Sequence, residues 1–258
     1  MSIIAKITIA LTALMPLALH GHVSHVPDFE YHKMFENDKE LRDEFFSIVK
    51  SDITPSPYEK LLLTRLRNKD SSIAEFRVAS KRLSYSVLQK VINCMQIEEN
   101  WIQTSLALTK GYVLNQHVEL VTIMRSGDIF INAFIDHFPN SGVSKYLIQR
   151  DEETSKPLFK YRKLSSTLNR ADTVIILEPL VATGGTLAMA IIDLDIQGIK
   201  EDQIIIASLI ASPEAIAYLS KRFPEIRLVT CSVDEKVNDR KFIVPGLGDF
   251  GDRYYGTD

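Results

Sequence analysis

Residues 174–186 hold the most informative group of polar side chains in the sequence. An apolar run ends at Leu177, the carboxylate of Glu178 follows, and a Thr-Gly-Gly-Thr turn at 183–186 opens a second apolar run. Glycine lets the backbone approach a ligand closely, and the first N–H groups of a helix have no partner inside the helix. Together with the helix dipole, such groups bind phosphate. Because Glu178 could also hold vicinal hydroxyls of a sugar, the segment suits a ribose 5-phosphate.

The same turn has a simpler interpretation as a plain connection between a strand and a helix. It lacks the lysine of a Walker loop and the glycine spacing of a dinucleotide fingerprint, so those two nucleotide-binding motifs are excluded. Taken alone, the turn does not decide between a phosphate site and a plain connection. The assignment therefore needs support from other parts of the chain.

The polar turn must be positioned by the elements around it, and the apolar pattern predicts these elements. A capping box at 72–75 begins a helical run of apolar residues that ends near Met95. Strands are then predicted over 118–124, 143–148, 173–177, 203–209 and 226–231, and helices over 129–138, from 184 to about 196, and from 212 onward. This alternation predicts an α/β fold with a parallel sheet and right-handed crossovers.

The N-terminal part of the chain differs from the rest. An apolar stretch at 7–19 is followed by a charged segment at 25–52 and a proline-containing break at 54–57. We therefore expect an N-terminal extension over 1–54 and a main domain over 55–258. The apolar stretch has the length of a signal-peptide core and is too short to span a bilayer, but no clean cleavage site follows it. A buried or amphipathic extra helix is the alternative.

The composition is that of an ordinary globular protein. The apolar fraction is 45%, the charged fraction 24%, and the net charge -3, with Lys and Arg spread along the chain. A nucleic-acid binder usually has a basic surplus, so no nucleic-acid partner is expected. Cys94 and Cys231 are interpreted as small buried hydrophobes, and one disulfide between them stays open. His20, His22 and His25 lack the further ligands of a zinc site, which favours a polar linker.

Five segments in the same order resemble one enzyme family. Residues 178–186 resemble the motif that binds phosphoribosyl pyrophosphate (PRPP) in type I phosphoribosyltransferases. Residues 243–257, Ile-Val-Pro-Gly-Leu-Gly-Asp-Phe-Gly-Asp-Arg-Tyr-Tyr-Gly-Thr, closely resemble the signature that ends uracil phosphoribosyltransferases, especially those of eukaryotic type. The other matching segments are 63–77, 125–127 and 150–154. The resemblance extends over about 57–258.

The resemblance implies a role for each matching residue. Arg125, Arg150 and Asp249 are implied to be catalytic. The residues implied to bind PRPP are Arg125, Arg150, Glu178, Pro179, Leu180, Val181, Ala182, Thr183, Gly184, Gly185, Thr186 and Asp249. The residues implied to bind uracil are Ile243, Gly248, Asp249 and Phe250. Mg²⁺ is the implied cofactor, bound through PRPP; no residue is assigned as its direct ligand, and Asp249 is the candidate contact.

The family also sets expectations for the whole protein. The implied fold is the type I phosphoribosyltransferase fold, with helices on both faces of a parallel sheet and a helical N-terminal extension. The implied reaction converts uracil and PRPP into UMP and pyrophosphate, a step of pyrimidine salvage. A homodimer or homotetramer with an exchanged arm or hairpin is implied, and GTP is a candidate effector. PRPP is a cytosolic metabolite, so a cytoplasmic location is favoured over export through the signal-like stretch.

Two residues depart from the family pattern. Glu178 stands where the family loop usually begins with Asp, and Ser126 stands where Ala is usual. One extra methylene moves a carboxylate outward by ~1.5 Å, enough to misplace a ribose. A non-catalytic homologue that binds PRPP or UMP is therefore the first alternative to an active enzyme. An RNA-binding regulator of the same fold and an enzyme for another base are the others.

Overall fold

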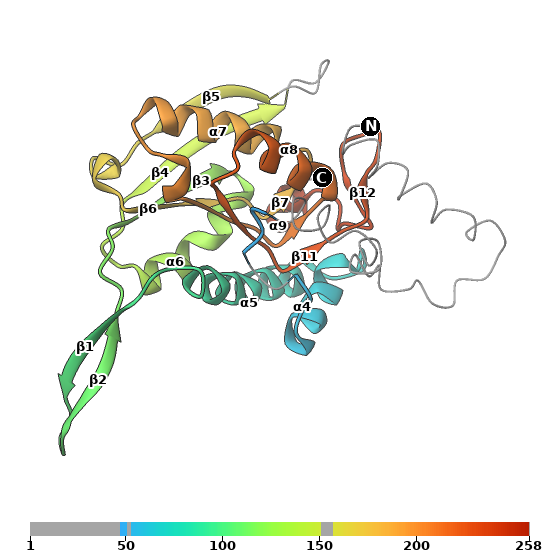
Figure 1. Cartoon of the computed structure of the whole chain (residues 1–258). Helices are drawn as coiled ribbons and strands as arrows, with labels where there is room; N and C mark the ends of the chain where they lie inside the picture. The colour runs from blue at the N-terminus through green and yellow to red at the C-terminus, as the bar shows by residue number, and fades with distance from the viewer. Residues whose placement is uncertain (1–46, 51–52, 151–156, 258) are drawn as a thin grey trace, which may run out of the picture.

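The computed structural model describes residues 47–50, 53–150 and 157–257 (Figure 1). The predicted helical extension with its apolar stretch at 7–19 lies outside the described residues, except for its last few positions. Residues 151–154 of the predicted Arg-Asp-Glu-Glu-Thr segment also lie outside them. Among the helices that are described, none is long and apolar enough to cross a membrane.

A six-stranded sheet in the order β10-β8-β6-β3-β4-β5 forms the centre of the fold. Its strands are β10 (Arg227–Val229), β8 (Ile204–Ala207), β6 (Thr173–Leu177), β3 (Val118–Met124), β4 (Val143–Arg150) and β5 (Pro157–Lys163). Neighbouring strands from β10 to β4 run parallel, and β5 runs antiparallel to β4 at the edge. The predicted parallel sheet is confirmed. Strand β5 has no counterpart in the prediction, because nearly all its residues are exposed and show no buried period.

Four of the described helices begin at a residue whose side chain caps them. The described helices are α4 (Pro57–Arg67), α5 (Ile73–Ile92), α6 (Ile131–His137), α7 (Gly185–Ile196), α8 (Pro213–Arg222) and α9 (Phe250–Tyr255). Ser72 and Glu75 form the predicted capping box of α5, and Ser56 and Glu59 form a second one on α4. Helix α6 is shorter than predicted, because a 3₁₀ turn occupies its beginning.

Helices cover both faces of the sheet, as predicted (Figure 1). Alternate residues of β6 point to opposite sides, so Val174 and Ile176 belong to one buried cluster while Ile175 and Leu177 belong to another. The first cluster contains the inner faces of α7 and α8, and the second contains those of α4, α5 and α6. A parallel strand covered in this way is apolar throughout, which explains why its sequence has no alternation.

Smaller elements complete the described part of the fold. They are the hairpin of β1 (Glu98–Gln103) and β2 (Leu108–Val113), a sheet of β7 (Leu180–Val181), β9 (Ile210–Ala211) and β11 (Ser232–Val233), the pair β12 (Lys236–Val237) and β13 (Ile243–Val244), and the 3₁₀ turns η1 (Ser126–Phe130), η2 (Leu168–Arg170) and η3 (Glu201–Gln203). The family resemblance implied an arm or hairpin without giving its position, and the apolar pattern predicted none of these elements. Strands of two residues are too short to show a period.

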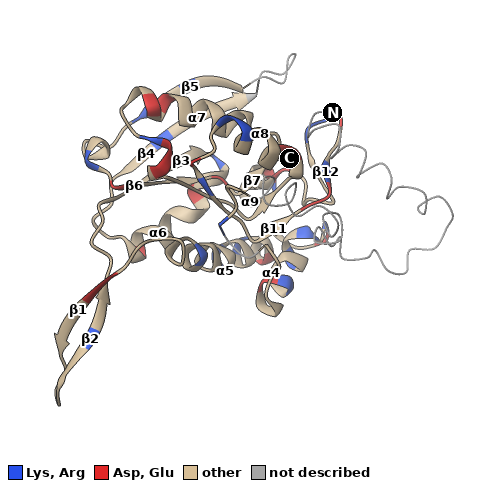
Figure 2. Cartoon of the chain, in the orientation of Figure 1, with Lys and Arg blue, Asp and Glu red and all other residues tan. Residues whose placement is uncertain are grey.

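Residues 48–50 continue the sheet beyond β10. Val49 pairs with Leu228 in a parallel bridge, and the Leu228 N–H donates to the carbonyl of Ile48 at 2.6 Å. The Ile48 side chain is fully buried in the first cluster. Along the ribbon, Lys and Arg positions are interspersed with Asp and Glu positions (Figure 2).

Two neighbouring isoleucines on α7 test this packing. Ile191 is 1% exposed and Ile192 is 39% exposed. Ile191→Ala should lower the free energy of unfolding by ~2–5 kcal/mol because it leaves a cavity against the sheet. Ile192→Ala makes the same change in helix propensity and should alter stability by only about 0.5 kcal/mol. Urea unfolding of both variants measures the difference, and equal losses would mean that α7 contacts the sheet through another face.

Candidate active site

A cavity of about 430 Å³ opens at the carboxyl ends of the sheet strands. Its wall is formed by the end of β3, Glu178 directly after β6, the turn that opens α7, the loop between β12 and β13, and the start of α9. Ligands of open α/β sheets bind at this edge, because the loops that follow parallel strands meet there. We therefore take this cavity as the candidate active site.

Most of the predicted site residues line this one cavity. From the phosphate segment they are Glu178, Leu180, Val181, Ala182, Thr183, Gly184 and Thr186, and from the C-terminal signature they are Ile243, Gly248, Asp249 and Phe250. Two segments predicted from separate motifs are thus brought together by the fold. Pro179, Gly185 and Arg125 do not belong to the cavity wall. Arg150 is the last residue of β4, and its side chain lies outside what the structure describes.

Glu178 is a buried carboxylate at the floor of the loop after β6. Its backbone N–H donates to the carbonyl of Ala207 at 3.1 Å, which continues the pairing of β6 with β8. Its side-chain Oε1 accepts a hydrogen bond of 3.1 Å from the Ser126 hydroxyl. The two residues that depart from the family pattern are therefore in direct contact.

The turn before α7 has the geometry of an anion cradle. Gly184 is the N-cap residue with φ +75°, a conformation that favours glycine, and α7 begins at Gly185. A Cβ on Gly184 would also lie 3.0 Å from the Tyr218 ring. The unpaired N–H groups of the first turn of α7 can bind phosphate here, with Thr183 and Thr186 beside them in the cavity wall.

Arg125 is held by the C-terminal helix. Its Nη2 donates to Asp252 Oδ1 at 2.8 Å and its Nη1 to Thr257 Oγ1 at 3.0 Å. The Tyr255 hydroxyl donates to the Arg125 carbonyl at 3.1 Å. The peptide between Met124 and Arg125 is cis. The Arg125 side chain therefore lies beside the cavity, against α9.

The glycine after Arg-Ser sits against the end of β6. A Cβ on Gly127 would lie 2.2 Å from the carbonyl oxygen of Leu177, and backbone at this position cannot move aside easily. Asp128, the next residue, accepts hydrogen bonds from the Thr122 hydroxyl at 2.9 Å and from Lys145 Nζ at 3.1 Å. These contacts hold η1 close to the loop that carries Glu178.

Asp249 and Phe250 begin α9 and have different environments. The Asp249 carboxylate caps the helix by accepting from the Asp252 N–H at 2.9 Å. The Phe250 ring is buried in the second cluster, with its centroid 5.1 Å from that of Phe76 and 6.0 Å from that of Tyr254. Phe250 thus belongs both to the second buried cluster and to the cavity wall.

Sequence reasoning missed three residues of the cavity wall in the loop between β12 and β13. They are Arg240, Lys241 and Phe242. Lys241 has a φ of +66° and is the last residue of a tight turn, in which its N–H donates to the Asn238 carbonyl at 2.9 Å. The signal was available, since two adjacent basic residues stand one residue before the C-terminal signature. They add positive charge to a cavity that already has a phosphate-binding turn.

Comparison with known proteins identifies the family. The family model for uracil phosphoribosyltransferase matches residues 53–257. The chain belongs to this family. It is 34% identical to the uracil phosphoribosyltransferase of Dictyoglomus thermophilum over 206 residues, covering 80% of this chain and 98% of the relative. It is 36% identical to uracil phosphoribosyltransferase 1 of Schizosaccharomyces pombe over 199 residues, covering 77% of this chain and 90% of the relative.

A solved protein from Aquifex aeolicus has the same architecture. It superposes with a TM-score of 0.69 at 29% identity, and the match covers 80% of this chain and 98% of the solved chain. The expected type I phosphoribosyltransferase fold is confirmed. The match to the uracil phosphoribosyltransferase family covers residues 53–257, and the residues that line the cavity described above lie within it.

The acidic groups of this uracil phosphoribosyltransferase cavity are few. Glu178 and Asp249 are the carboxylates of its wall. Within the described ranges, no cluster of three or more His, Cys, Asp or Glu side chains is arranged to hold a metal ion. Outside the wall, the hydrogen bond from Arg125, followed by that from Thr257, lowers the pKa of Asp252 below its usual value.

The Asp252 contact predicts a pH-dependent contribution to stability. A carboxyl whose pKa is lowered by folding stabilises the protein above its unfolded pKa, and the contribution is lost as the pH falls through the lowered value. Both side chains are well exposed, at 51% for Arg125 and 38% for Asp252. Asp252→Asn should therefore cost at most ~1 kcal/mol at neutral pH.

Urea unfolding of the variant and the parent at neutral and acid pH checks this. The two stabilities should converge as the pH falls below the lowered pKa of Asp252. A difference of the same size at both pH values would contradict a role for the carboxylate charge.

Proposed function

We propose that this chain transfers the phosphoribosyl group of PRPP to uracil, giving UMP and pyrophosphate. The observation that carries this proposal is the single cavity that joins the phosphate-binding turn before α7 to the C-terminal signature. The relatives that match most of the chain are named uracil phosphoribosyltransferases. In the reaction, the C1–oxygen bond to pyrophosphate breaks, uracil N1 bonds to C1, and the N1 proton is released.

The turn at 183–186 marks the half of the cavity that would bind PRPP. We propose that the first N–H groups of α7 and the two threonine hydroxyls bind the 5′-phosphate, and that Glu178 accepts from the ribose hydroxyls. Residues 179–182 would shape the loop between these two contacts. Arg125 and Arg150 would face the pyrophosphate from the ends of β3 and β4.

The departure of pyrophosphate sets the electrostatic requirement. The ribose gains positive charge and resembles an oxocarbenium ion, while negative charge collects on the leaving group. Arginine side chains that reach the pyrophosphate would stabilise this charge. Mg²⁺ typically binds through one or two carboxylates and the phosphates of its substrate, which suits a wall with Glu178 and Asp249 as its acids. When bound, it would neutralise charge on the pyrophosphate.

In the other half of the cavity, backbone groups would recognise the base. Ile243, Gly248 and Phe250 line this half, and none of them has a polar side chain. Uracil presents O4 as an acceptor and N3–H as a donor, whereas cytosine reverses both. A fixed backbone cannot rotate to suit both bases, so each mismatch leaves a buried group unpaired at ~1–3 kcal/mol. Such a site rejects the wrong base strongly.

Two variants of Phe250 isolate its N–H from its ring. Phe250 is the first residue of α9, where proline is tolerated, and the extended Asp249 before it is compatible with a following proline. Phe250→Ala and Phe250→Pro both remove the buried ring and should lose ~3–5 kcal/mol of stability. Only the proline variant also removes the N–H. The alanine variant should keep its preference for uracil, and the proline variant should lose it.

Product detection with PRPP, Mg²⁺ and a panel of bases measures this preference. The parent and both variants are assayed with uracil, cytosine and purines. Turnover of uracil by the parent supports the proposed function. Turnover of cytosine at a comparable rate, or a proline variant that equals the alanine variant, would mean that the base lies elsewhere. Binding of PRPP or UMP without turnover would favour the non-catalytic alternative.

The contact between Ser126 and Glu178 predicts coupled effects. Glu178→Gln should slow turnover, because losing a charge-assisted hydrogen bond costs ~1.5–3 kcal/mol. Glu178→Asp draws the carboxylate back from the Ser126 hydroxyl, so its activity should depend on residue 126. The double variant Ser126→Ala/Glu178→Asp should then differ from the sum of the two single variants by ~0.5–3 kcal/mol.

A double-mutant cycle on kcat/KM for PRPP gives the coupling energy. Ser86→Ala, at a half-buried position of α5 that is not part of the cavity wall, is a matched serine control. If the effects of the Ser126 and Glu178 variants on kcat/KM are strictly additive, the two residues are not functionally coupled.

A second copy of the chain is the proposed macromolecular partner. The hairpin of β1 and β2 projects from the body in Figure 1, and it exposes Trp101, Leu106, Leu108 and Tyr112. A lone two-stranded hairpin is marginal in water, so these side chains support a contact with another subunit in a homodimer or homotetramer. GTP as an effector stays a prediction. The interspersed charges of Figure 2 support small-molecule substrates over RNA.

Two expectations about the chain as a whole remain proposals. We propose residues 55–258 as the catalytic domain and 1–54 as an extension whose first part is dispensable for activity. We also propose that the enzyme works in the cytoplasm, where PRPP is made.

A further inference from the structure

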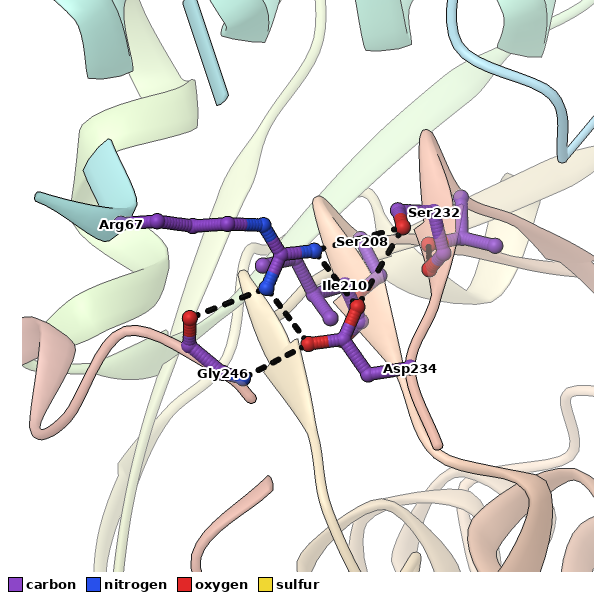
Figure 3. A network of polar contacts seen from close by, with 7 residues as sticks. Arg67, Ser208, Ile210, Ser232, Asp234 and Gly246 are labelled. Carbon is purple, nitrogen blue, oxygen red and sulfur yellow. Dashed lines mark hydrogen bonds and ion pairs between the residues drawn. The ribbon is translucent and has the colours of Figure 1, made fainter. Parts of the chain in front are cut away.

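A partly buried ion pair lies next to residues 243–248, the base segment, whose two ends line the base half of the cavity (Figure 3). Arg67 is the last residue of α4, and it bonds to Asp234 through Nη1 to Oδ2 at 2.6 Å and Nη2 to Oδ1 at 2.5 Å. The Asp234 side chain is 3% exposed and that of Arg67 is 26% exposed. Bidentate pairing of this kind is strong and fixes the orientation of both groups.

The ion pair holds both backbone groups of Gly246. Arg67 Nη1 donates to the Gly246 carbonyl at 2.9 Å, and the Gly246 N–H donates to Asp234 Oδ2 at 2.8 Å. Gly246 has φ +55°, and a Cβ there would lie 2.1 Å from the carbonyl oxygen of Ile243. The peptide is therefore clamped in a turn that only glycine fits.

Gly246 lies between two residues of the cavity wall. Ile243 and Gly248 line the cavity, whereas Arg67, Asp234 and Gly246 do not. The ion pair can therefore affect a bound base only through the backbone from 243 to 248.

A second arginine ties the same segment to the same end of α4. Arg253 donates from Nη1 to the Leu247 carbonyl at 2.8 Å and from Nη2 to the Asn68 carbonyl at 2.7 Å, and it also bonds to the Leu66 carbonyl. The end of α4 is thus the fixed point to which residues 246 and 247 are attached. On the other side, the Asp234 N–H donates to the Ala211 carbonyl of β9 at 2.9 Å.

We propose that Arg67 and Asp234 are positioning residues that set the affinity and selectivity of the base site by fixing residues 243–248. This inference rests on the proposed function, because it takes the backbone of that segment as the base-reading surface. A backbone donor has no rotamer, so its position is set by whatever holds its peptide. Loosening Gly246 lets the donors and acceptors at 243 and 248 move, and a base then binds weakly and with less discrimination. The hydrogen bonds of Arg67 and Asp234 go to each other, to Ser232, to Gly246 and to Ala211, and none of these residues belongs to the turn before α7.

Arg67→Lys tests the proposal with the charge retained. A lysine is a point charge and cannot bond to both Asp234 oxygens and the Gly246 carbonyl at once. The KM for uracil should rise about tenfold or more, as expected when charge-assisted hydrogen bonds are lost. The KM for PRPP should stay unchanged, and the preference for uracil over cytosine should fall. Arg65→Lys makes the same substitution on the exposed side of α4 and should change neither KM.

Amide hydrogen exchange gives a second readout that needs no turnover. In Arg67→Lys, exchange in residues 243–248 should accelerate while that of β8 stays as in the parent. Asp234→Asn, a variant of equal size, should have the same two effects if Arg67→Lys does not fold.

An unchanged KM for uracil or unchanged exchange in 243–248 would overturn the proposal. So would equal losses of uracil and PRPP affinity with a lower Tm, since the pair would then only hold the fold together. A parent enzyme that does not use uracil refutes the proposed function instead, and the exchange measurement still decides whether the pair positions this segment.

Discussion

The burial of β6 on both faces is the constraint on which the site depends. All five of its residues are buried, and both neighbouring strands pair with it in parallel. A shift of register by one residue would turn each of these side chains to the opposite face and disrupt the close packing of both clusters, so the strand has one position in the sheet. Glu178 follows it directly, and α7 begins after the next short strand. The packed core therefore fixes the positions of the Glu178 carboxylate and of the phosphate-binding turn.

The base segment, residues 243–248, is held mainly by side-chain contacts and not by pairing in a sheet. Residues 243–248 form little regular structure, and only β13 at their start pairs with another strand. Their backbone is fixed by side chains that reach in from α4 and α9, including Arg67 and Arg253. Phe250 adds a ring buried in the second cluster. One half of the cavity is therefore set by the sheet, and the other by a few polar contacts between distant segments.

This difference explains how much of the protein could be predicted from its sequence. The buried strands and long helices were predicted because their apolar pattern is local and extends over many residues. The edge strand β5 and the two-residue strands have no such pattern. The motif residues of the site were recognised within single segments. The contacts of Asp252 with Arg125 and of Asp234 with Arg67 join residues far apart in the chain, and no spacing rule reveals them.

The contact between Ser126 and Glu178 changes the meaning of the two departures from the family pattern. Considered separately, the longer side chain of Glu178 and the added hydroxyl of Ser126 each suggest a site that is losing its function. The structure places them 3.1 Å apart, with the hydroxyl donating to the carboxylate. The extra methylene of glutamate adds a rotatable bond, and a hydrogen bond on its oxygen restricts that freedom. A residue that restrains the longer side chain is expected where the position of the carboxylate still matters. The pair therefore favours an enzyme with an altered ribose contact over a homologue that has lost catalysis.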